Sequence, residues 1–369
     1  MPHTVLHVAE TVQGGIAGYL RMCLDLPRDA FDQKALVPSC QRAHLPEDPR
    51  ILTYPETARG PRAVLALARH LRRAVRECAP DLLYLHSTLS LLALALVRPD
   101  VPVLYCPHGW AAHRFSGTGP RDRAIRSLES RLAGLADRTV NVSRNDAALA
   151  RHLGYGGRQV VVENAVPPPV PDARSDLFGD GLNLLFVGRF DRQKGLDLLL
   201  EAFARARRDR PDLRLHLAGA VVRGGIPTDL PEGAEPLGWV DPGRIDDLYR
   251  SVDAVVLPSR WEGLPLVLPE ALRNGTPVIC SDRAGLPDLV EEGVTGHVLP
   301  LCVESWGRRL ATLDAARLRA MRPACRAAWA ARFDVARFHR EISAQMVEAA
   351  RPSPTGAGIS PALSARKSG

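Results

Sequence analysis

Short apolar segments alternate with amphipathic segments along most of the 369-residue chain. In residues 1–167 the apolar segments are continuous rather than broken by polar residues, which is typical of strands buried on both faces of a parallel sheet. The predicted strands of this part span residues 4–10, 33–39, 81–87, 101–109, 138–143 and 159–166. Segments 61–79 and 121–136 have the periodicity of helices. The alternation predicts a parallel sheet with helices on its faces.

The alternation stops at residues 168–181, where a proline-rich run favours an extended linker. It resumes over residues 182–333, with strands predicted at 182–188, 213–219, 234–240, 251–259, 275–282 and 296–301. Residues 334–350 predict a helix that packs back toward the N-terminal domain, and residues 351–369 have the small, polar composition of a disordered tail. The predicted fold class is α/β, with two Rossmann-like domains facing across a cleft.

Composition narrows the class of protein. The chain is 46% hydrophobic and 24% charged, which is ordinary for a soluble globular protein. Its longest apolar run, residues 89–97, is about half the length that crosses a bilayer. Only 5% of the residues are aromatic, and no basic and stacking pattern suggests nucleic acid. The seven scattered cysteines form no C-x-x-C pair that would suggest zinc. These features indicate a cytoplasmic protein.

The net charge of +7 is unevenly distributed, because residues 1–170 carry +6 and the remainder +1. A basic excess of this kind suits an anionic membrane surface or a phosphorylated ligand, and it is equally compatible with a solvated face that has no partner. Segments 61–79 and 121–136 add apolar and arginine-rich helix faces to this basic part, although amphipathic helices also arise simply from packing on a sheet.

The candidate chemistry falls at predicted strand ends, where open parallel sheets bind their ligands. Arg189 and Lys194 follow the strand 182–188 and precede a helix, whose N-terminus also favours anions, so they are candidates for a diphosphate site. Glu262 lies in the loop after the strand 251–259, and Glu270 in the first turn of the next helix. Carboxylates accept paired hydrogen bonds from sugar hydroxyls, but Glu270 would also suit a helix dipole without any ligand.

Two stretches carry a resemblance to a known family. "GRFDRQKGLDLLLEAF" is followed about 55 residues later by "LPSRWEGLPLVLPEALRNGTPVICSDRAGLPDLVEEGVTGHVLP". This region, residues 182–300, resembles the C-terminal half of glycosyltransferase family 4, retaining enzymes of the GT-B fold, and Glu262 and Glu270 match the family's E-x7-E motif. In the first half the similarity is thinner and comprises the glycine-rich "GGIAG", the "PHG" that contains His108, and "NVS" before "ENAVP".

The resemblance implies roles for these residues. Arg189 and Lys194 would bind the donor diphosphate, Glu270 would hold the ribose hydroxyls, and Glu262 would lie near the donor sugar. His108 would contact the sugar from the opposite domain, with His86 as the second choice. The remaining donor-binding candidates are Gly263, Leu264, Gly14, Gly15 and Gly18. The chain departs from a plain E-x7-E loop at Pro265 and Pro269, which remove two backbone N–H donors.

The expected activity is that of a retaining hexosyltransferase, which moves a sugar from a UDP- or GDP-sugar to a hydroxyl of a glycan or polyprenyl-linked acceptor. With the arginine-rich helix faces of the basic part, this leads to the hypothesis of a peripheral enzyme of cell-envelope or exopolysaccharide biosynthesis on the inner face of the plasma membrane. No cofactor is expected, and no metal, because the chain has no D-x-D sequence. Two alternatives remain. A catalytically silent nucleotide-sugar-binding subunit would have the same residues, whereas a dinucleotide-dependent oxidoreductase fits poorly because Gly14, Gly15 and Gly18 do not have G-x-G-x-x-G spacing.

Overall fold

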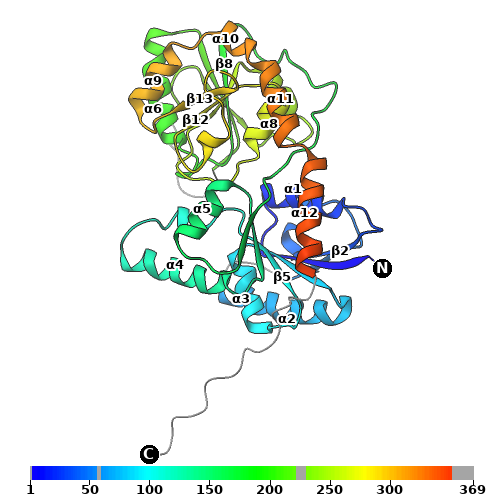
Figure 1. Cartoon of the computed structure of the whole chain (residues 1–369). Coiled ribbons are helices and arrows are strands. Elements are labelled where there is room, and N and C mark those ends of the chain that lie inside the picture. Colours follow the sequence, from blue (N-terminus) through cyan, green and yellow to red (C-terminus); the bar gives the residue numbers. More distant parts are fainter. Residues whose placement is uncertain (1, 56–59, 222–229, 351–369) are drawn as a thin grey trace, which may run out of the picture.

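The structure, a computed structural model, describes residues 2–55, 60–221 and 230–350. The described part forms two α/β domains, each built around its own parallel sheet, stacked one on the other (Figure 1). This confirms the predicted fold class. The segment 351–369, for which the sequence predicts disorder, lies outside the described residues.

The first domain contains a seven-stranded sheet in the order β3-β2-β1-β4-β5-β6-β7, with every pair parallel. Its strands are β1 (His3–Ala9), β2 (Phe31–Pro38), β3 (Ile51–Tyr54), β4 (Leu82–His86), β5 (Val103–Cys106), β6 (Arg138–Asn141) and β7 (Arg158–Val161). Its helices are α1 (Gly15–Leu24), α2 (Pro61–Cys78), α3 (Thr88–Val97), α4 (Pro120–Ala133) and α5 (Arg144–His152). The central strands are fully buried, as their continuous apolar sequences require.

The second domain contains a six-stranded parallel sheet in the order β10-β9-β8-β11-β12-β13. Its strands are β8 (Leu182–Val187), β9 (Leu213–Ala218), β10 (Ala234–Gly238), β11 (Ala254–Leu257), β12 (Val278–Ser281) and β13 (Gly296–Leu299). The helices are α6 (Leu196–Asp209), α7 (Ile245–Ser251), α8 (Val267–Arg273), α9 (Val303–Ala311), α10 (Ala315–Ala320), α11 (Arg322–Arg332) and α12 (Val335–Ala350).

One strand is absent from the sequence-based prediction. β3, at the edge of the first sheet, is only four residues long and follows a loop with two prolines, so its sequence carries little strand signal. Its pairing with β2, for example of Ile51 with Ala35, is a tertiary contact that the local pattern does not encode.

Each strand order has one point at which the direction of winding reverses. In the first sheet it lies between β1 and β4, and in the second between β8 and β11. Ligands of open parallel sheets bind outside the carboxyl ends of the strands at such points. Gly14 follows β1, His86 ends β4, Lys194 follows β8 and Glu262 follows β11, so these candidates lie at the two positions, whereas His108 follows β5, one strand away.

Two segments join the domains. The chain first crosses between Val161 and Leu182, and it returns through α11 into α12, which packs on α1, β4 and β5 of the first domain. Phe338 of α12 lies 5.1 Å, centroid to centroid, from Tyr19 of α1, and His339 hydrogen-bonds the carbonyl of Met22 at 2.9 Å. Figure 1 shows α12 running beside the lower domain, away from the rest of the second one.

Candidate functional site

The centre of the site in the second domain is an enclosed ion pair between Lys194 and Glu262. Lys194 precedes α6, and its Nζ lies 2.7 Å from Oε1 of Glu262 in the loop after β11. Ser259 Oγ donates to the same oxygen at 2.8 Å. Only 14% of the Lys194 side chain and 6% of the Glu262 side chain are exposed. Among the described residues, Oε2 of Glu262 accepts no hydrogen bond, so it is available to a ligand.

Glycine backbone geometry allows the two loops to approach. Gly195, between Lys194 and α6, has a φ of +71°, and a Cβ at this position would lie 2.0 Å from the carbonyl oxygen of Pro258. No L side chain fits there without moving the loop after β11. Gly195 therefore brings Lys194 next to the segment that carries Glu262.

Arg189 shares the loop after β8 but is placed differently from Lys194. Its side chain is 47% exposed, and its Nη2 lies 3.2 Å from Asp191 Oδ2 and 2.9 Å from Gln193 Oε1. Gln193 in turn donates to the carbonyl of Trp261 at 3.1 Å. The described contacts thus hold Arg189 at the rim of the loop and Lys194 inside it.

Glu270 lies in the first turn of α8, where the sequence predicts it. Its Oε2 accepts a hydrogen bond of 2.8 Å from the hydroxyl of Tyr249 on α7, and Tyr249 is fully buried. Burial raises the pKa of the Glu270 carboxyl, and the Tyr249 hydrogen bond and the nearby Arg273 partly oppose that rise. The structure therefore fixes one oxygen of Glu270 and leaves Oε1 without a partner among the described residues.

The glycine loop of the first domain packs directly on the second domain. Gly14, with a φ of +67°, precedes α1, and a Cβ at this position would meet no atom within 4 Å. A Cβ at Gly15 would lie 3.4 Å from Leu266 Cδ1, and one at Gly18 would lie 3.7 Å from the same atom. These glycines allow α1 to approach the E-x7-E segment, while the backbone at Gly14 remains open to a ligand.

His108 follows β5 and begins a hydrogen-bonded chain that crosses four adjacent strands. Its Nε2 lies 2.9 Å from Nδ1 of His86 on β4, and His86 Nε2 lies 3.0 Å from Nδ1 of His7 on β1. His7 Nε2 is 2.5 Å from Oε1 of Gln33 on β2, whose Nε2 donates to the carbonyl of Cys23. His86, the second sequence candidate, is thus a buried support for His108.

The direction of each hydrogen bond follows from the fixed end of this chain. Because Gln33 donates to a carbonyl, its Oε1 accepts from His7 Nε2–H. His7 Nδ1 must then accept from His86 Nε2–H, and His86 Nδ1 from His108 Nε2–H. His108 is left with an unprotonated Nδ1, which is a hydrogen-bond acceptor.

Burial keeps all three imidazoles neutral near pH 7. It lowers the pKa of His7 to about 4, that of His86 well below its usual value, and that of His108 to about 3. The charges of His7 and His108 would add to the effect on His86. Because the three imidazoles are neutral, Gln33 determines which ring nitrogen of each histidine carries the proton, and no charge is passed along the chain.

The loops of the two domains meet at Gly109 and Gly263. A Cβ at Gly109, whose φ is +105°, would lie 3.5 Å from the Gly263 backbone nitrogen. A Cβ at Gly263 would in turn lie 3.1 Å from Gly109 Cα and 3.2 Å from Oδ2 of Asp146. Next to Gly263, the carbonyl of Leu264 accepts a 3.1 Å hydrogen bond from Asn164 Nδ2. These approaches place His108 and Glu262 in facing loops.

Sequence reasoning missed Asp146 and His113. Asp146, in the first turn of α5, is fully buried, and its Oδ1 lies 2.6 Å from His113 Nε2. Its Oδ2 has no hydrogen-bond partner in the described part of the chain. Burial raises the pKa of Asp146, the charge of Glu262 adds to the rise, and His113 opposes it. The available signal was the run Ser143-Arg-Asn-Asp, a helix-start pattern in which Ser143 caps the Asp146 amide.

Comparison with known families divides the chain at the linker. A family model described as Glycosyltransferase Family 4 matches residues 18–168. A second, described as Glycosyl transferases group 1, matches residues 172–314. Together the two matches include the Lys194–Glu262 pair and Glu270, and also Gln33, His86 and His108 of the histidine chain, whereas His7 precedes the first match.

Among curated proteins, the chain is 27% identical over 311 residues to an uncharacterized 41.2 kDa protein in the cps region of Klebsiella pneumoniae, covering 80% of this chain and 85% of that protein. It is 34% identical over 235 residues to a D-inositol 3-phosphate glycosyltransferase of Geodermatophilus obscurus, covering 55% of this chain. That match spans 52% of the relative, about half of its length.

Solved structures share the fold at low sequence identity. Sucrose-phosphate synthase from Thermosynechococcus elongatus has a TM-score of 0.78 and 20% identity, over 94% of this chain and 98% of that one. Anabaena HepE, solved in complex with UDP-glucose, has a TM-score of 0.74 and 20% identity, over 94% and 99%. Both matches span the two domains, so the relation extends to the arrangement of the whole fold.

Proposed function

The chain belongs to glycosyltransferase family 4, and from that premise we propose that it moves a hexose from a UDP- or GDP-sugar to an acceptor hydroxyl with retention of the anomeric configuration. The observation that carries the proposal is the enclosed Lys194–Glu262 pair at the carboxyl ends of β8 and β11. It puts a fixed cation at the start of a 14-residue helix, beside a carboxylate with one free oxygen.

Departure of the diphosphate is the step that these residues assist. As the bond between the anomeric carbon and the diphosphate oxygen lengthens, negative charge accumulates on the leaving group. Lys194, Arg189 and the N-terminus of α6 provide positive potential that is in place before the reaction. No metal ion is required for this stabilisation, so we propose a metal-independent reaction.

The acids and the histidine orient the rest of the donor. Glu270 Oε1 would accept from a ribose hydroxyl, and Glu262 would lie beside the transferred sugar with Oε2 free. His108 Nδ1 would accept a hydrogen bond from a sugar hydroxyl, because its tautomer leaves that nitrogen unprotonated. The two domains would thus hold the donor from opposite sides.

Retention requires the acceptor to attack the face that the diphosphate leaves. The acceptor oxygen bonds to the anomeric carbon, and its proton passes to the departing diphosphate oxygen, so neither enzyme carboxylate forms a covalent intermediate. Glu262 is not assigned as a nucleophile; its Oε1 accepts hydrogen bonds from Lys194 and Ser259, and its proposed role is to lie beside the sugar. Closure of the domains around the donor would exclude water.

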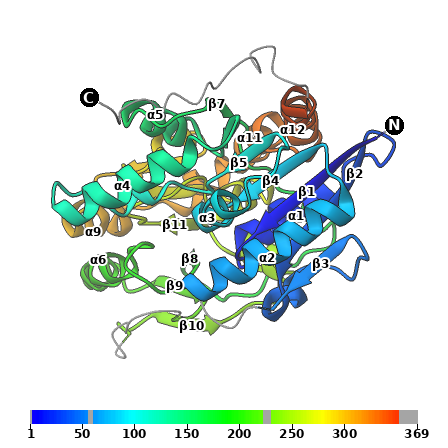
Figure 2. The ribbon, with the colours of Figure 1, turned by 90° about the horizontal axis from the view of Figure 1, so that it is seen from below.

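We further propose that the acceptor is a glycan or a polyprenyl-linked sugar of the cell envelope or an exopolysaccharide, reached at the cytoplasmic face of the membrane. A relative encoded in a cps region supports the envelope assignment. The helices α2, α3 and α4 form a row on one face of the first domain (Figure 2). Exposed leucines along this row are Leu65, Leu96, Leu128 and Leu135, and its exposed arginines include Arg62, Arg69, Arg72, Arg76, Arg121, Arg123 and Arg131.

Such a row has the composition of a surface that rests on anionic lipid. In the described part of the chain, no helix has the length and apolar character needed to cross a bilayer. We expect co-sedimentation with phosphatidylglycerol liposomes at low salt, and loss of it in the Arg69→Gln/Arg72→Gln/Arg76→Gln protein. A matched protein with Arg208→Gln/Arg308→Gln/Arg317→Gln should still bind. Equal behaviour of the two would refute the membrane assignment.

A thermal-shift panel with UDP, GDP, ADP and NAD tests the donor site. We expect either UDP or GDP to raise the melting temperature of the wild type, and Lys194→Ala and Glu270→Ala to abolish the shift. Lys34→Ala, at a surface ion pair with Asp32, and Glu304→Ala, at the first turn of another helix, are matched controls that should keep it. A shift by NAD alone, or by no nucleotide, would contradict the proposal, and donor binding without transfer to any acceptor would indicate a silent subunit.

A further inference from the structure

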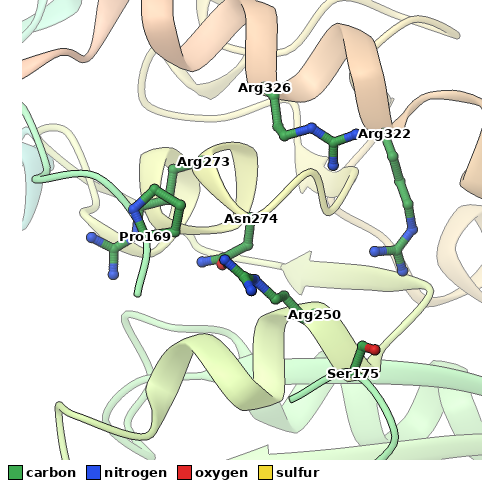
Figure 3. A pocket seen from close by; sticks show the side chains of 7 residues that line it. All are labelled: Pro169, Ser175, Arg250, Arg273, Asn274, Arg322 and Arg326. Atoms are coloured by element: carbon green, nitrogen blue, oxygen red, sulfur yellow. The ribbon is translucent and has the colours of Figure 1, made fainter. Parts of the chain in front are cut away.

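A second concentration of positive charge lies away from the donor site, at the end of α8 opposite to Glu262. Four arginines line a cavity of about 370 Å³ (Figure 3). Arg250 comes from α7 and Arg273 from α8, whereas Arg322 and Arg326 come from the first turns of α11. Asn274 and the linker complete the lining, which contains no carboxylate from the residues that the structure describes.

The positive charges of this cavity are only partly paired among the described residues. Arg273 pairs with the buried Asp246 at 2.7 Å. In the described part of the chain, Arg250, Arg322 and Arg326 have no carboxylate within ion-pair distance. Burial lowers the pKa of Arg322, the charge of the nearby Asp253 opposes that shift, and the positive charge of Arg326 adds to it. Three cations therefore line one cavity without a direct ion-pair partner among the described residues, and an anion that entered it would be attracted to all three.

The hydrogen bonds separate structural arginines from free ones. Arg250 is occupied by the linker, because it donates to the carbonyls of Val170, Pro171 and Ala173 and to Asn274 Oδ1. That arrangement explains Arg250 without any ligand.

The other three arginines keep unused donors. The Arg273 side chain is only 9% exposed, and its Nη1 and Nη2 donate to the Pro167 carbonyl and to Asp246, but its Nε has no hydrogen-bond partner among the described residues. Arg322 uses one donor, to the carbonyl of Val252 at 2.7 Å. Arg326 makes no hydrogen bond to the described residues, and its Nη1 lies against Gly275, where a Cβ would be 2.2 Å away. The free N–H groups thus come from one buried and two more accessible guanidinium groups.

We propose that this cavity is a binding site for a phosphate-class oxyanion, held chiefly by Arg322 and Arg326, with Arg273 at its base. Planar guanidinium groups donate in pairs and match the oxygens of a phosphate better than those of a halide. Several cations that line one cavity also favour a multivalent anion over a single carboxylate. The site is separate from the donor diphosphate site at Lys194 and does not depend on the proposed transfer reaction.

The cavity lies between the two segments that join the domains, so a ligand bound in it would contact both segments. Its walls include the linker, through Pro169 and Ser175, and the start of α11, which leads into the returning helix α12. These are the two segments that join the domains. A bound oxyanion would connect them to α8, the helix that carries Glu270, and would stabilise their present arrangement.

Isothermal titration calorimetry with inorganic phosphate, inorganic diphosphate and glycerol 3-phosphate, at constant ionic strength set with potassium chloride, tests the site. We expect binding to the wild type and at least a tenfold weaker affinity in the Arg322→Gln/Arg326→Gln protein. The Arg208→Gln/Arg308→Gln protein removes the same charge from exposed positions of α6 and α9 and should bind like the wild type. Titrations of all three proteins are repeated in the Lys194→Ala background, which removes the donor diphosphate site.

The outcomes distinguish the two sites. Phosphate binding that survives Lys194→Ala and is lost in Arg322→Gln/Arg326→Gln supports the cavity, and glycerol 3-phosphate then shows whether a phosphate monoester is accepted as well as the free ion. Binding that is lost in Lys194→Ala alone, or no binding at millimolar concentrations to a folded wild type, overturns the inference. A raised melting temperature with phosphate in the wild type, absent from the double variant, is the second readout.

Discussion

The two sides of the interdomain interface carry different chemistry. On the second domain, the loops after β8 and β11 present permanent charges, with Lys194 held by Glu262 and Arg189 at the rim. On the first domain, the loop after β5 presents His108 at the end of a buried and neutral hydrogen-bonded chain. One side suits a charged diphosphate, and the other suits the hydroxyl groups of a sugar.

The two domains keep their ligand-binding side chains in place in different ways. An ion pair can fix a cation with one contact, provided that its partner is buried and directional, as Glu262 is. A neutral acceptor has no such field, so its orientation and tautomer require a series of hydrogen bonds back to the main chain at Cys23. The position of His108 in the first domain therefore depends on residues far from the ligand, whereas the position of Lys194 in the second domain does not.

The largest expected effect comes from removing the cation. Lys194→Ala should lower kcat/KM for the nucleotide sugar by about 10²- to 10³-fold, which corresponds to the loss of one preorganised charge at the departing diphosphate. Steady-state release of the nucleoside diphosphate measures it, with Lys34→Ala as the matched control. A change within about threefold would show that Lys194 does not stabilise the leaving group.

Glu270→Ala should have the next largest effect, on affinity rather than turnover. Loss of a charge-assisted hydrogen bond to a ribose hydroxyl is worth about 1.5 to 3 kcal/mol, so the nucleoside diphosphate should bind about 10- to 100-fold more weakly. Tyr249→Phe removes only the internal hydrogen bond to Glu270 and should stay within about threefold. Calorimetric titration compares them, and an equal loss in both would mean that Glu270 acts through helix packing.

The neutral chain should make the first domain sensitive to acid. His7 has a pKa of about 4 when folded and about 6.5 when unfolded, so the unfolded chain binds more protons and stability falls as the pH drops below 6.5. Between pH 6.5 and pH 5 the free energy of unfolding should fall by about 1.6 kcal/mol through His7. Urea unfolding at both pH values should show this loss in the wild type and a smaller one in His7→Gln, while other titrating groups are common to both. Identical losses would contradict the neutral state of His7.

Gln33 lies at the far end of the hydrogen-bonded chain from His108, so its substitution should have the smallest effect. Gln33→Leu removes the acceptor that fixes the His7 tautomer, so His108 should no longer be held with Nδ1 unprotonated. We expect kcat/KM to fall about fivefold, or about 1 kcal/mol, with no change in nucleoside diphosphate affinity, which belongs to the other domain. The control is Gln159→Leu, which removes a part-buried Gln that is not in the hydrogen-bonded chain from Gln33 to His108. A fall in nucleotide affinity in Gln33→Leu would show that the two sides are not independent.

Local sequence was sufficient for much of the fold and for the charged side of the site. Continuous apolar runs predicted both parallel sheets, because buried parallel strands need apolar residues on both faces. Strand ends and helix starts predicted where Lys194, Glu262 and Glu270 lie, since these residues are close to the elements that position them. The short edge strand β3 was missed because its four residues depend on pairing with β2.

Only the tertiary structure brings together the histidine chain of the first domain and the arginine-lined cavity of the second domain. His7, Gln33, His86 and His108 are scattered over 100 residues, and nothing local distinguishes them until β2, β1, β4 and β5 lie side by side. The same holds for Asp146 beside Gly263, and for Arg273 beside Arg322 and Arg326. Sequence periodicity reports which face of an element is buried, but the partner across that face is set by the order of strands and the return of the chain, which only the packed fold specifies.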